Sequence, residues 1–173
     1  GAALDQLERF PEARQAYQEA LALQPNNPAI LTNLGVSHLM AGEPDDAEPI
    51  LRQAVALPGA PAEARQNLAI AVALRLQHDV DQLDATLAAD GLPPVRFGVG
   101  VNSGLAVAAH VGTAARSQYT ILGDTVNTAA RLVSIAAADQ VIASAATVDA
   151  IESPGLRLIG QIDLKGIDVP VTV

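Results

Sequence analysis

The 173-residue chain carries a formal net charge of −9, which argues against broad binding to nucleic acids or to anionic membrane surfaces. It contains no cysteine, and this excludes disulfides, thiolate metal sites and cysteine nucleophiles. Half of its residues are hydrophobic but only 2% are aromatic, so aliphatic side chains must build the core. No apolar run could span a bilayer, and no basic-then-apolar leader is present. The sequence therefore predicts a soluble, cytoplasmic protein that binds neither nucleic acid nor membrane.

Residues 1–68 repeat with a period of 34, the difference between the positions of Ala13 and Ala47. The recurrence also covers large side chains and a short polar segment: Tyr17 with Leu51, Ala20 with Ala54, and Asn33-Leu34-Gly35 with Asn67-Leu68-Ala69. Small residues at repeated positions let two helices approach closely, and the large ones fill the groove between them. This period and these residue types resemble the tetratricopeptide (TPR) repeat, a pair of antiparallel helices.

Prolines and glycines mark the loops of this region. The segment Pro25-Asn26-Asn27-Pro28 is expected to connect the two repeats, because proline stops one helix and favours the start of the next. Residues 42–46 are expected to form the turn inside the second repeat. In this register Gly1 stands where the first repeat has its opening-helix glycine, so that repeat lacks most of its first helix. Because about three stacked repeats are needed for stability, the segment is expected to depend on its neighbour.

A single long helix is predicted from Ala69 to Asp90. Its apolar residues follow steps of three and four, namely Val72, Leu76, Val80, Leu83 and Leu87. The repeat fails here, since its next small-residue position would be Asp81. Residues 91–94, with the sequence G-L-P-P, end the helix. The helix is expected to open as a third TPR helix and to close as part of the domain that follows.

Two strands are predicted next, joined by a turn at residues 102–104. Residues 95–101 alternate between apolar positions and polar or glycine positions, and residues 105–111 have the same apolar alternation. The second stretch is therefore expected to be the partner strand of the first. Gly98 and Gly100 share one strand face, which allows a ligand or another part of the backbone to approach closely. The spacing leaves both possibilities open.

The stretch from Tyr119 to Arg131, Y-T-I-L-G-D-T-V-N-T-A-A-R, has the pattern of a strand that runs into a helix. Asp124 or Thr125 is the expected helix cap. One face of that helix then carries polar side chains at helical spacing: Asn127, Arg131 and Ser134. A guanidinium close to a helix N-terminus suits a phosphate-bearing ligand. The alternative is an ordinary solvent-exposed polar face, and spacing alone does not choose between the two.

The remaining segments are assigned from turn residues and β-forming residues. Residues 112–118 are expected to be a polar loop, residues 140–143 a short strand and residues 145–151 a short helix. Residues 156–162 and 169–173 are expected to pair as a terminal hairpin. The three histidines lie apart, with no second ligand at metal spacing, so structural or solvent-exposed roles are expected for all of them: His38, His78 and His110.

The stretch Y-T-I-L-G-D-T-V-N-T-A-A-R-L resembles the signature of the class III nucleotidyl cyclases, the adenylate and guanylate cyclases. Upstream, L-P-P-V-R-F-G-V-G-V-N-S-G-L-A-V-A-A-H-V-G resembles the strands that precede this signature, and downstream L-K-G-I-D-V-P-V-T-V resembles the closing hairpin. The resemblance covers roughly residues 70–173 in the family's order. It implies an α+β protein, with TPR-like antiparallel helix pairs in residues 1–68 and a partial ferredoxin-like α/β sandwich, the C-terminal half of a cyclase domain, in residues 69–173.

The cyclase resemblance also implies roles for single residues. In this family ATP or GTP binds between two catalytic domains, so a homodimer or heterodimer is implied. Asn127 would orient the ribose. Arg131 would bind the phosphates and stabilise the charge that develops as the ribose 3′-oxygen attacks the α-phosphate. Thr120 stands where the family contacts the purine, and Asp124 is a further expected substrate contact.

The half of the family's domain that binds metal has no counterpart in this sequence. In the family two Asp residues of that half hold two metal ions, and no F-x-D-I-x-G-F-type segment occurs here. The family's base-selecting Lys is missing too, and Asp45 and Asp46 lie in a predicted TPR turn. Mg²⁺ or Mn²⁺ is therefore expected only if another chain supplies the missing half. No metal ligand is assigned to this chain alone.

Three functions remain open from the sequence. The first is the C-terminal half of a class III cyclase behind TPR helices, active only with a chain that supplies the metal-binding half. The second is a non-catalytic TPR interaction module with a degenerate cyclase remnant. The third is a rearranged fragment with no function of its own. The first two share a protein partner bound through the TPR helices, and they differ in whether cyclic nucleotide is made.

Overall fold

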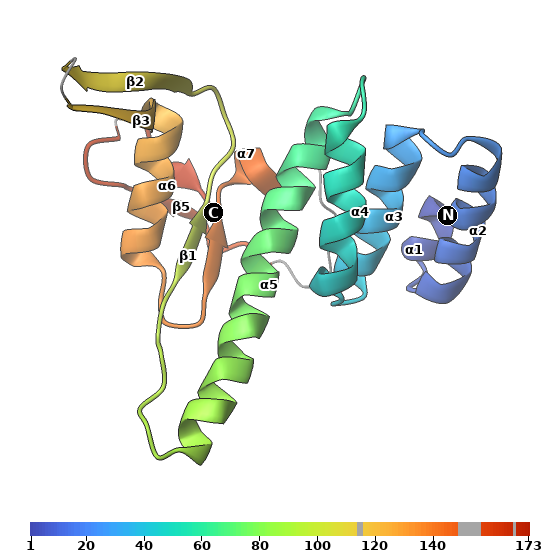
Figure 1. The fold of residues 1–173 in the computed structure, drawn as a ribbon, viewed down its shortest axis with the longest axis horizontal. Helices are drawn as coiled ribbons and strands as arrows, with labels where there is room; N and C mark the ends of the chain where they lie inside the picture. Colours follow the sequence, from blue (N-terminus) through green and yellow to red (C-terminus); the bar gives the residue numbers. More distant parts are fainter. Residues whose placement is uncertain (114–115, 149–156, 168) are drawn as a thin grey trace. The chain divides into compact units, whose positions relative to one another are not determined.

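The computed structural model describes residues 1–113, 116–148, 157–167 and 169–173. Contacts divide the chain into two compact units. The helical unit is built on Gly1–Val95, and the mixed unit consists of Arg96–Thr147 with Leu158–Val173. Helices come first, and strands with further helices follow, which is the α+β order predicted from the sequence (Figure 1). No helix among the described residues is long and apolar enough to cross a membrane.

The helical unit is a series of helices that pack against their neighbours in the sequence (Figure 1). Their bounds are α1 (Ala2–Asp5), α2 (Phe10–Leu23), α3 (Pro28–Met40), α4 (Pro44–Ala56) and α5 (Ala62–Ala89). Pro28 and Pro44 are the first residues of α3 and α4, where a backbone N–H would have no partner in the helix. Asn27 caps α3, because its Oδ1 accepts from the N–H of Ala29 at 3.0 Å and of Ile30 at 3.3 Å. The last two residues of the predicted inter-repeat loop, Asn27 and Pro28, are therefore the N-cap and the first residue of α3.

The 34-residue repeat is visible in how glycines face large side chains. A Cβ placed on Gly35 of α3 would lie 2.5 Å from Cγ of Leu51 on α4. A Cβ on Gly1 would lie 2.2 Å from the ring of Tyr17 on α2. The two glycines are one period apart, and so are the two large residues. Each repeat therefore packs its helices through the same contact, as predicted for antiparallel TPR-like pairs.

Helix α5 begins at Ala62, whereas the sequence predicted a start at Ala69. The earlier start follows from the third repeat, since residues 62–68 are the opening of its first helix and pack on the preceding repeat. Helix α5 contacts α3 and α4, and its buried residues are Ala64, Asn67, Ile70, Ala71 and Ala73. Further along, Leu76 and Leu83 are 44% and 46% exposed. The first half of α5 therefore completes the core of the helical unit.

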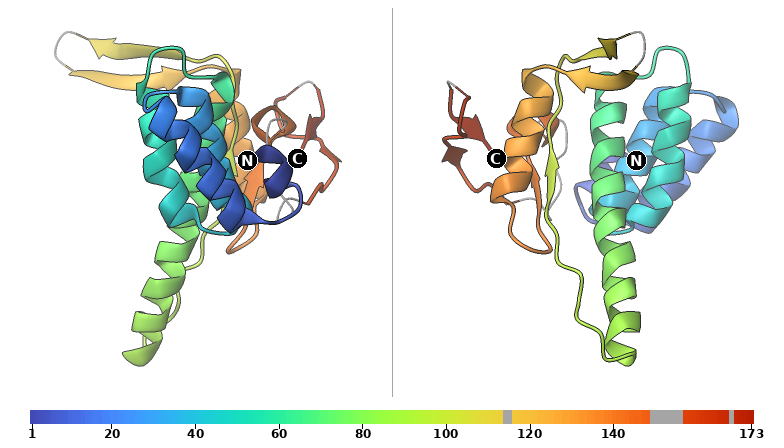
Figure 2. Two further views of the ribbon diagram at one scale, coloured as in Figure 1. Left: turned by 90° about the vertical axis from the view of Figure 1, so that its right-hand side faces the viewer. Right: turned by 60° about the vertical axis from the view of Figure 1, so that its left-hand side comes forward.

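After Arg96, the described residues fold into short strands and two helices. Their bounds are β1 (Val99–Val101), β2 (Val107–Thr113), β3 (Arg116–Leu122), α6 (Asp124–Ile135), β4 (Val141–Ala143), α7 (Ala145–Val148), β5 (Gln161–Ile162) and β6 (Val171–Thr172). Strands β1 and β4 pair in parallel, whereas β2 with β3 and β5 with β6 pair antiparallel. Parallel strands need a crossover rather than a hairpin, and α6 lies on that crossover and packs beside β1 (Figure 2).

The predicted pairing of residues 95–101 with residues 105–111 is wrong. Strand β1 places Val99 opposite Val141 of β4, and β2 places Val107 opposite Leu122 of β3. Alternation identifies strands but not their partners, because every candidate partner has the same period of two. The predicted polar loop at residues 112–118 is wrong as well, since β2 runs to Thr113 and β3 starts at Arg116. Residues 114 and 115 lie outside the described part of the chain.

The two glycines near β1 serve the packing of α6. A Cβ on Gly100 would lie 2.6 Å from the backbone N of Val133 and 2.7 Å from the carbonyl O of Ala129. A Cβ on Gly98 would lie 2.6 Å from Cβ of Ala136. Both glycines therefore let the helix backbone approach the strand. Of the two possibilities left open by the sequence, the structure shows close packing of another element.

The core of the mixed unit joins α6, β4 and the C-terminal hairpin through Leu132, Ile142, Leu164 and Val173. The predicted terminal hairpin is confirmed in a shorter form, with Ile162 opposite Val171. The predicted strand at residues 140–143 is β4. The predicted helix at residues 145–151 is described as far as Val148, and its remainder, with residue 156 of the predicted hairpin, lies outside the described residues.

Candidate functional site

Helix α6 starts where Gly123 ends strand β3. Gly123 has a φ of +138°, a conformation that residues with a side chain rarely adopt. Its carbonyl accepts from the N–H of Val126 at 3.0 Å and of Asn127 at 3.1 Å. The prediction that Asp124 or Thr125 caps the helix is wrong, because Gly123 is the N-cap and no side chain bonds to the first turn as a cap. Asp124 is instead the first residue of the helix.

The three predicted site residues of α6 share one exposed face. Asp124, Asn127 and Arg131 follow at steps of three and four, so at about 100° per residue their directions fall within roughly 60° of one another. All three side chains are exposed. Within the described residues, none of the three has a hydrogen-bond or ion-pair partner for its side chain. Thr128 and Leu132, whose directions lie about 40° and 80° from that of Asp124, are buried, so the exposed face lies directly beside the packed side of α6.

Thr120, the fourth predicted site residue, lies on β3 shortly before the helix. It stands opposite Ala109 of β2 and is partly buried. Its neighbour Tyr119 is 61% exposed and makes an edge-to-face contact with the ring of His110, with ring centroids 5.2 Å apart. Strand β3 and helix α6 contact each other. The structure therefore brings three predicted site residues together on α6 and places the fourth on the strand that leads into it.

Asn102, predicted from the sequence only as a turn residue, contacts the same helix. Its Nδ2 donates to the carbonyl of Thr125 at 3.0 Å, and its Oδ1 accepts from the hydroxyl of Ser144 at 2.5 Å. The hydroxyl of Thr125 donates to the carbonyl of Leu105 at 2.6 Å. These bonds hold the first turn of α6 from outside the helix. The N-S-G motif is the sequence signal for this contact, since a Cβ on Gly104 would lie 2.5 Å from Oγ1 of Thr125.

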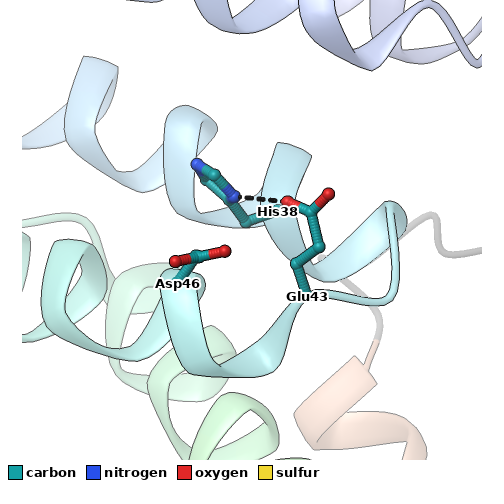
Figure 3. Close-up of side chains that lie close together, drawn as sticks. All are labelled: His38, Glu43 and Asp46. Carbon is teal, nitrogen blue, oxygen red and sulfur yellow. Dashed lines mark hydrogen bonds and ion pairs between the residues drawn. The ribbon is translucent and has the colours of Figure 1, made fainter.

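A group of possible metal ligands occurs in the helical unit. Among the described residues, His38, Glu43 and Asp46 place one ligand atom each within 4.8 Å of the others (Figure 3). Nδ1 of His38 lies 2.8 Å from Oε2 of Glu43, and the same oxygen accepts from Nη1 of Arg14 at 2.5 Å. The positive charge of Arg14 already neutralises the carboxylate of Glu43, and it would repel a metal cation bound at this position. The cluster therefore links α2, α3 and α4. The expectation that no second possible ligand lies near a histidine is wrong for His38.

The mixed unit does not bring metal ligands together within the described residues. No three His, Asp or Glu side chains of its described part converge on one point. Asp139 is ion-paired with Arg96, and Asp124 stands on the exposed face of α6. Two-metal chemistry of the kind that the cyclase resemblance implies needs converging carboxylates. The described residues of this unit do not fit such a metal pair.

Comparison with known sequences identifies the family. Residues 54–172, more than half of the chain, match the family described as "Adenylate and Guanylate cyclase catalytic domain". The chain belongs to this family. Residues 1–64 match a tetratricopeptide repeat family, so both resemblances found in the sequence are confirmed. The matched ranges overlap, and the domain boundary predicted between residues 68 and 69 stays a prediction.

Individual cyclases show how much of the catalytic domain is matched. Adenylate cyclase 1 of Rhizobium meliloti is 42% identical over 60 residues, which are 35% of this chain and 9% of that protein. The adenylyl cyclase CyaB from P. aeruginosa has a TM-score of 0.54 at 30% identity, over 62% of this chain and 57% of that one. The guanylyl cyclase Cya2 has a TM-score of 0.53 at 25% identity, over 66% and 58%. The chain thus spans only a small part of the length of Adenylate cyclase 1. The likeness to the two solved cyclase structures confirms the predicted α+β fold with a cyclase-like part.

Proposed function

We propose that this chain supplies the C-terminal half of a class III nucleotidyl cyclase site, which converts ATP or GTP to a 3′,5′-cyclic nucleotide and pyrophosphate. The observation that carries the proposal is the exposed face of α6. Asp124, Asn127 and Arg131 lie on that face with no side-chain partner within the described residues, and the helix is part of the family-matched region. Polar side chains left unpaired on a packed helix are available to a ligand.

The chemistry of these side chains suits a nucleoside triphosphate. The planar guanidinium of Arg131 can bind two phosphate oxygens at once. Asn127, one turn earlier, offers an amide donor and acceptor to the ribose hydroxyls. As the ribose 3′-oxygen bonds to the α-phosphorus and pyrophosphate leaves, negative charge moves onto the phosphate oxygens, and Arg131 stabilises that charge. We assign Thr120 to the purine edge and Asp124 to a further substrate contact.

The metal-binding part of the site is proposed to come from a second chain. No three of the described His, Asp or Glu side chains of the mixed unit converge on one point, so the Mg²⁺ or Mn²⁺ ions that the family implies are assigned to that chain. The functional assembly would then be a dimer, with the nucleotide at the shared interface. The TPR helices would bind a protein partner and bring the cyclase half to it. This division makes the helical unit a recruiting element and the mixed unit a chemical one.

The decisive experiment tests the chain with and without a metal-binding half. The purified chain, alone and mixed with a polypeptide that carries such a half, is incubated with ATP or GTP and Mg²⁺ or Mn²⁺, and cyclic nucleotide is measured by chromatography. We expect no product from the chain alone and product from the mixture, because the chain alone lacks the largest charge-stabilising contribution.

Each other outcome has a defined meaning. Product from the pure chain alone would show that it contains metal ligands that were missed. A stable complex that makes no product from either nucleotide would reject the catalytic proposal. That result would favour the alternative of a non-catalytic TPR interaction module with a cyclase remnant.

A further inference from the structure

The N-S-G segment after β1 carries a polar contact that the proposed function does not use. Asn102 is half-buried and presents its amide to two different elements. Its Nδ2 donates to the carbonyl of Thr125 in the first turn of α6 at 3.0 Å. Its Oδ1 accepts from the hydroxyl of Ser144, between β4 and α7, at 2.5 Å. The donor and the acceptor of one amide are thus both engaged.

The Ser144 side of this contact is buried and held in place. Ser144 is 2% exposed and Thr147 is fully buried. The N–H of Ser144 donates to the carbonyl of Val101 at 3.0 Å, and its Oγ lies 3.2 Å from Oγ1 of Thr147. A hydroxyl that donates to the amide of Asn102 sets the orientation of that amide, because only its oxygen can accept. The nitrogen is thereby directed at α6.

The first turn of α6 receives a second bond from the same segment. The hydroxyl of Thr125 donates to the carbonyl of Leu105 at 2.6 Å. Gly104 makes room for this hydroxyl, since a Cβ at that position would lie 2.5 Å from it. Residues 102–105 therefore form two hydrogen bonds with Thr125, one to its backbone carbonyl and one from its side-chain hydroxyl. The helix itself begins on a glycine with no side-chain cap.

We propose that Asn102 is a positioning residue, which sets where the first turn of α6 lies and thereby where Asn127 and Arg131 meet the nucleotide. Both residues follow Thr125 within two turns of the same helix. A displacement of Thr125 therefore moves both side chains. The role toward the nucleotide rests on the proposed function, but the anchoring of α6 can be measured without it.

Three substitutions separate this role from a general contribution to folding. Asn102→Asp keeps the acceptor for Ser144 but replaces the donor by a carboxylate oxygen that faces the carbonyl of Thr125. Ser144→Ala removes the hydroxyl and leaves the donor of Asn102 in place. Thr147→Ala removes a buried side chain of the same cluster that makes no bond to Asn102 itself. It is the matched control for lost stability.

Amide hydrogen exchange of the whole chain is the first measurement. In Asn102→Asp, the N–H groups that bond to the Gly123 carbonyl should exchange about tenfold faster relative to those in the last turn of α6. This is the factor expected for the loss of one hydrogen bond of ordinary strength. Thr147→Ala should change exchange evenly along the helix. An even change in Asn102→Asp as well, or a larger local effect from Ser144→Ala, would overturn the anchoring role.

Steady-state kinetics of the complex with a metal-binding half are the second measurement. Asn102→Asp should lower kcat about 10–100-fold, because small displacements of catalytic groups have effects of this size, with a smaller change in KM. Thr147→Ala should retain kcat. Wild-type kcat in Asn102→Asp would overturn the positioning role. A wild-type complex that makes no cyclic nucleotide rejects the proposed function instead, and the exchange result then decides whether Asn102 anchors α6.

Discussion

Arg131 is the single residue on which the proposed chemistry depends most. Its guanidinium lies on the exposed face of α6 with no ion-pair partner within the described residues. In a complex that contains the metal-binding half, Arg131→Ala is expected to lower kcat about 10²–10³-fold, or roughly 3–4 kcal/mol. KM should change much less, because the lost donor acts on charge that develops only in the transition state. Arg131→Lys should recover part of kcat, since an ammonium lacks the planar fork.

Arg96 is the matched control, being another exposed arginine of the mixed unit, paired with Asp139. Arg96→Ala should keep kcat and lose at most about 1 kcal/mol of stability, as for a surface ion pair. Steady-state kinetics and a thermal melt of each variant measure both quantities. If Arg131 were an ordinary surface residue, its substitution would change stability by less than about 0.5 kcal/mol and leave turnover alone. Unchanged kcat in a folded, assembled Arg131→Ala complex would remove Arg131 from the site.

Gly100 allows a second prediction about a single residue. A side chain there would meet the backbone N of Val133 and the carbonyl of Ala129, so α6 would have to move as a whole. Gly100→Ala is expected to lower the free energy of unfolding by about 1–3 kcal/mol, which urea unfolding measures. The neighbouring Ser103→Ala should change it by less than about 0.5 kcal/mol. Wild-type stability of Gly100→Ala would contradict the direct packing of α6 on β1.

Helices α4 and α5 are joined by an ion-pair network that makes the helical unit sensitive to acid. Glu48 of α4 is 8% exposed and pairs with Arg52 on its own helix and with Arg75 on α5. The hydrogen bond from Arg52 lowers the pKa of Glu48 below 4.5, and Arg75 lowers it further, while burial acts in the opposite direction. A carboxyl group with a depressed folded pKa stabilises the fold above its unfolded pKa. This stabilisation is complete above pH 4.5 and is lost as the pH falls through the lowered value.

Glu48→Gln is expected to be less stable than the wild type at neutral pH. The difference should shrink as the pH falls below 4.5, because the wild-type carboxylate then becomes protonated as well. Urea unfolding at a series of pH values measures this. Glu19→Gln is the control, since Glu19 is exposed on α2 and has no ion pair within the described residues. A difference between Glu48→Gln and the wild type that stays constant to the lowest pH would contradict the assignment.

Helix α5 completes the helical unit, so its removal should unfold the remainder. Residues 1–68 alone would cut α5 before Ile70, Ala71 and Ala73, all of which are buried, and Ala71 belongs to a core cluster with Leu51. The fragment of residues 1–68 is expected to be largely unfolded, whereas residues 1–95 should unfold cooperatively, because stacked repeats need their faces covered. Circular dichroism melts compare the two. A cooperative transition of the shorter fragment, or none of the longer one, would contradict this dependence.

The proposed enzyme is an assembly of two chains, and this predicts a dependence on concentration. The specific activity of the complemented complex should fall on dilution and return when the second chain is in excess, as mass action requires. Sedimentation at the same concentrations measures the assembled fraction. If activity per chain stayed constant while the complex dissociated, a single chain would be sufficient and the shared site would be wrong.

Most of the helical unit could be predicted from local patterns. Gly1 recurs as Gly35 and Tyr17 recurs as Leu51, 34 residues later, and each glycine faces the large residue of its own repeat. The repeated residues therefore predict which helices pack against each other. Helix α5 starts earlier than predicted, because residues 62–68, which still follow the repeat, already form its first turns. In the mixed unit the positions of β4 and α6 were predicted, while the partners of β1 and β2 were not.

The amino-acid sequence alone establishes the repeat, the cyclase family and the residues that share a face of α6. Asn127, Arg131 and Ser134 must share that face in any α-helix, because their spacing matches its period. Asp124, expected as a cap, joins the face only because the helix begins after Gly123. Strand pairing, the packing role of Gly100 and the bonds of Asn102 depend on the tertiary fold. Asn102 and Ser144 are 42 residues apart in the chain, and no local period relates them. Periodicity specifies which side of an element is apolar, whereas the partner on that side depends on how the whole unit packs.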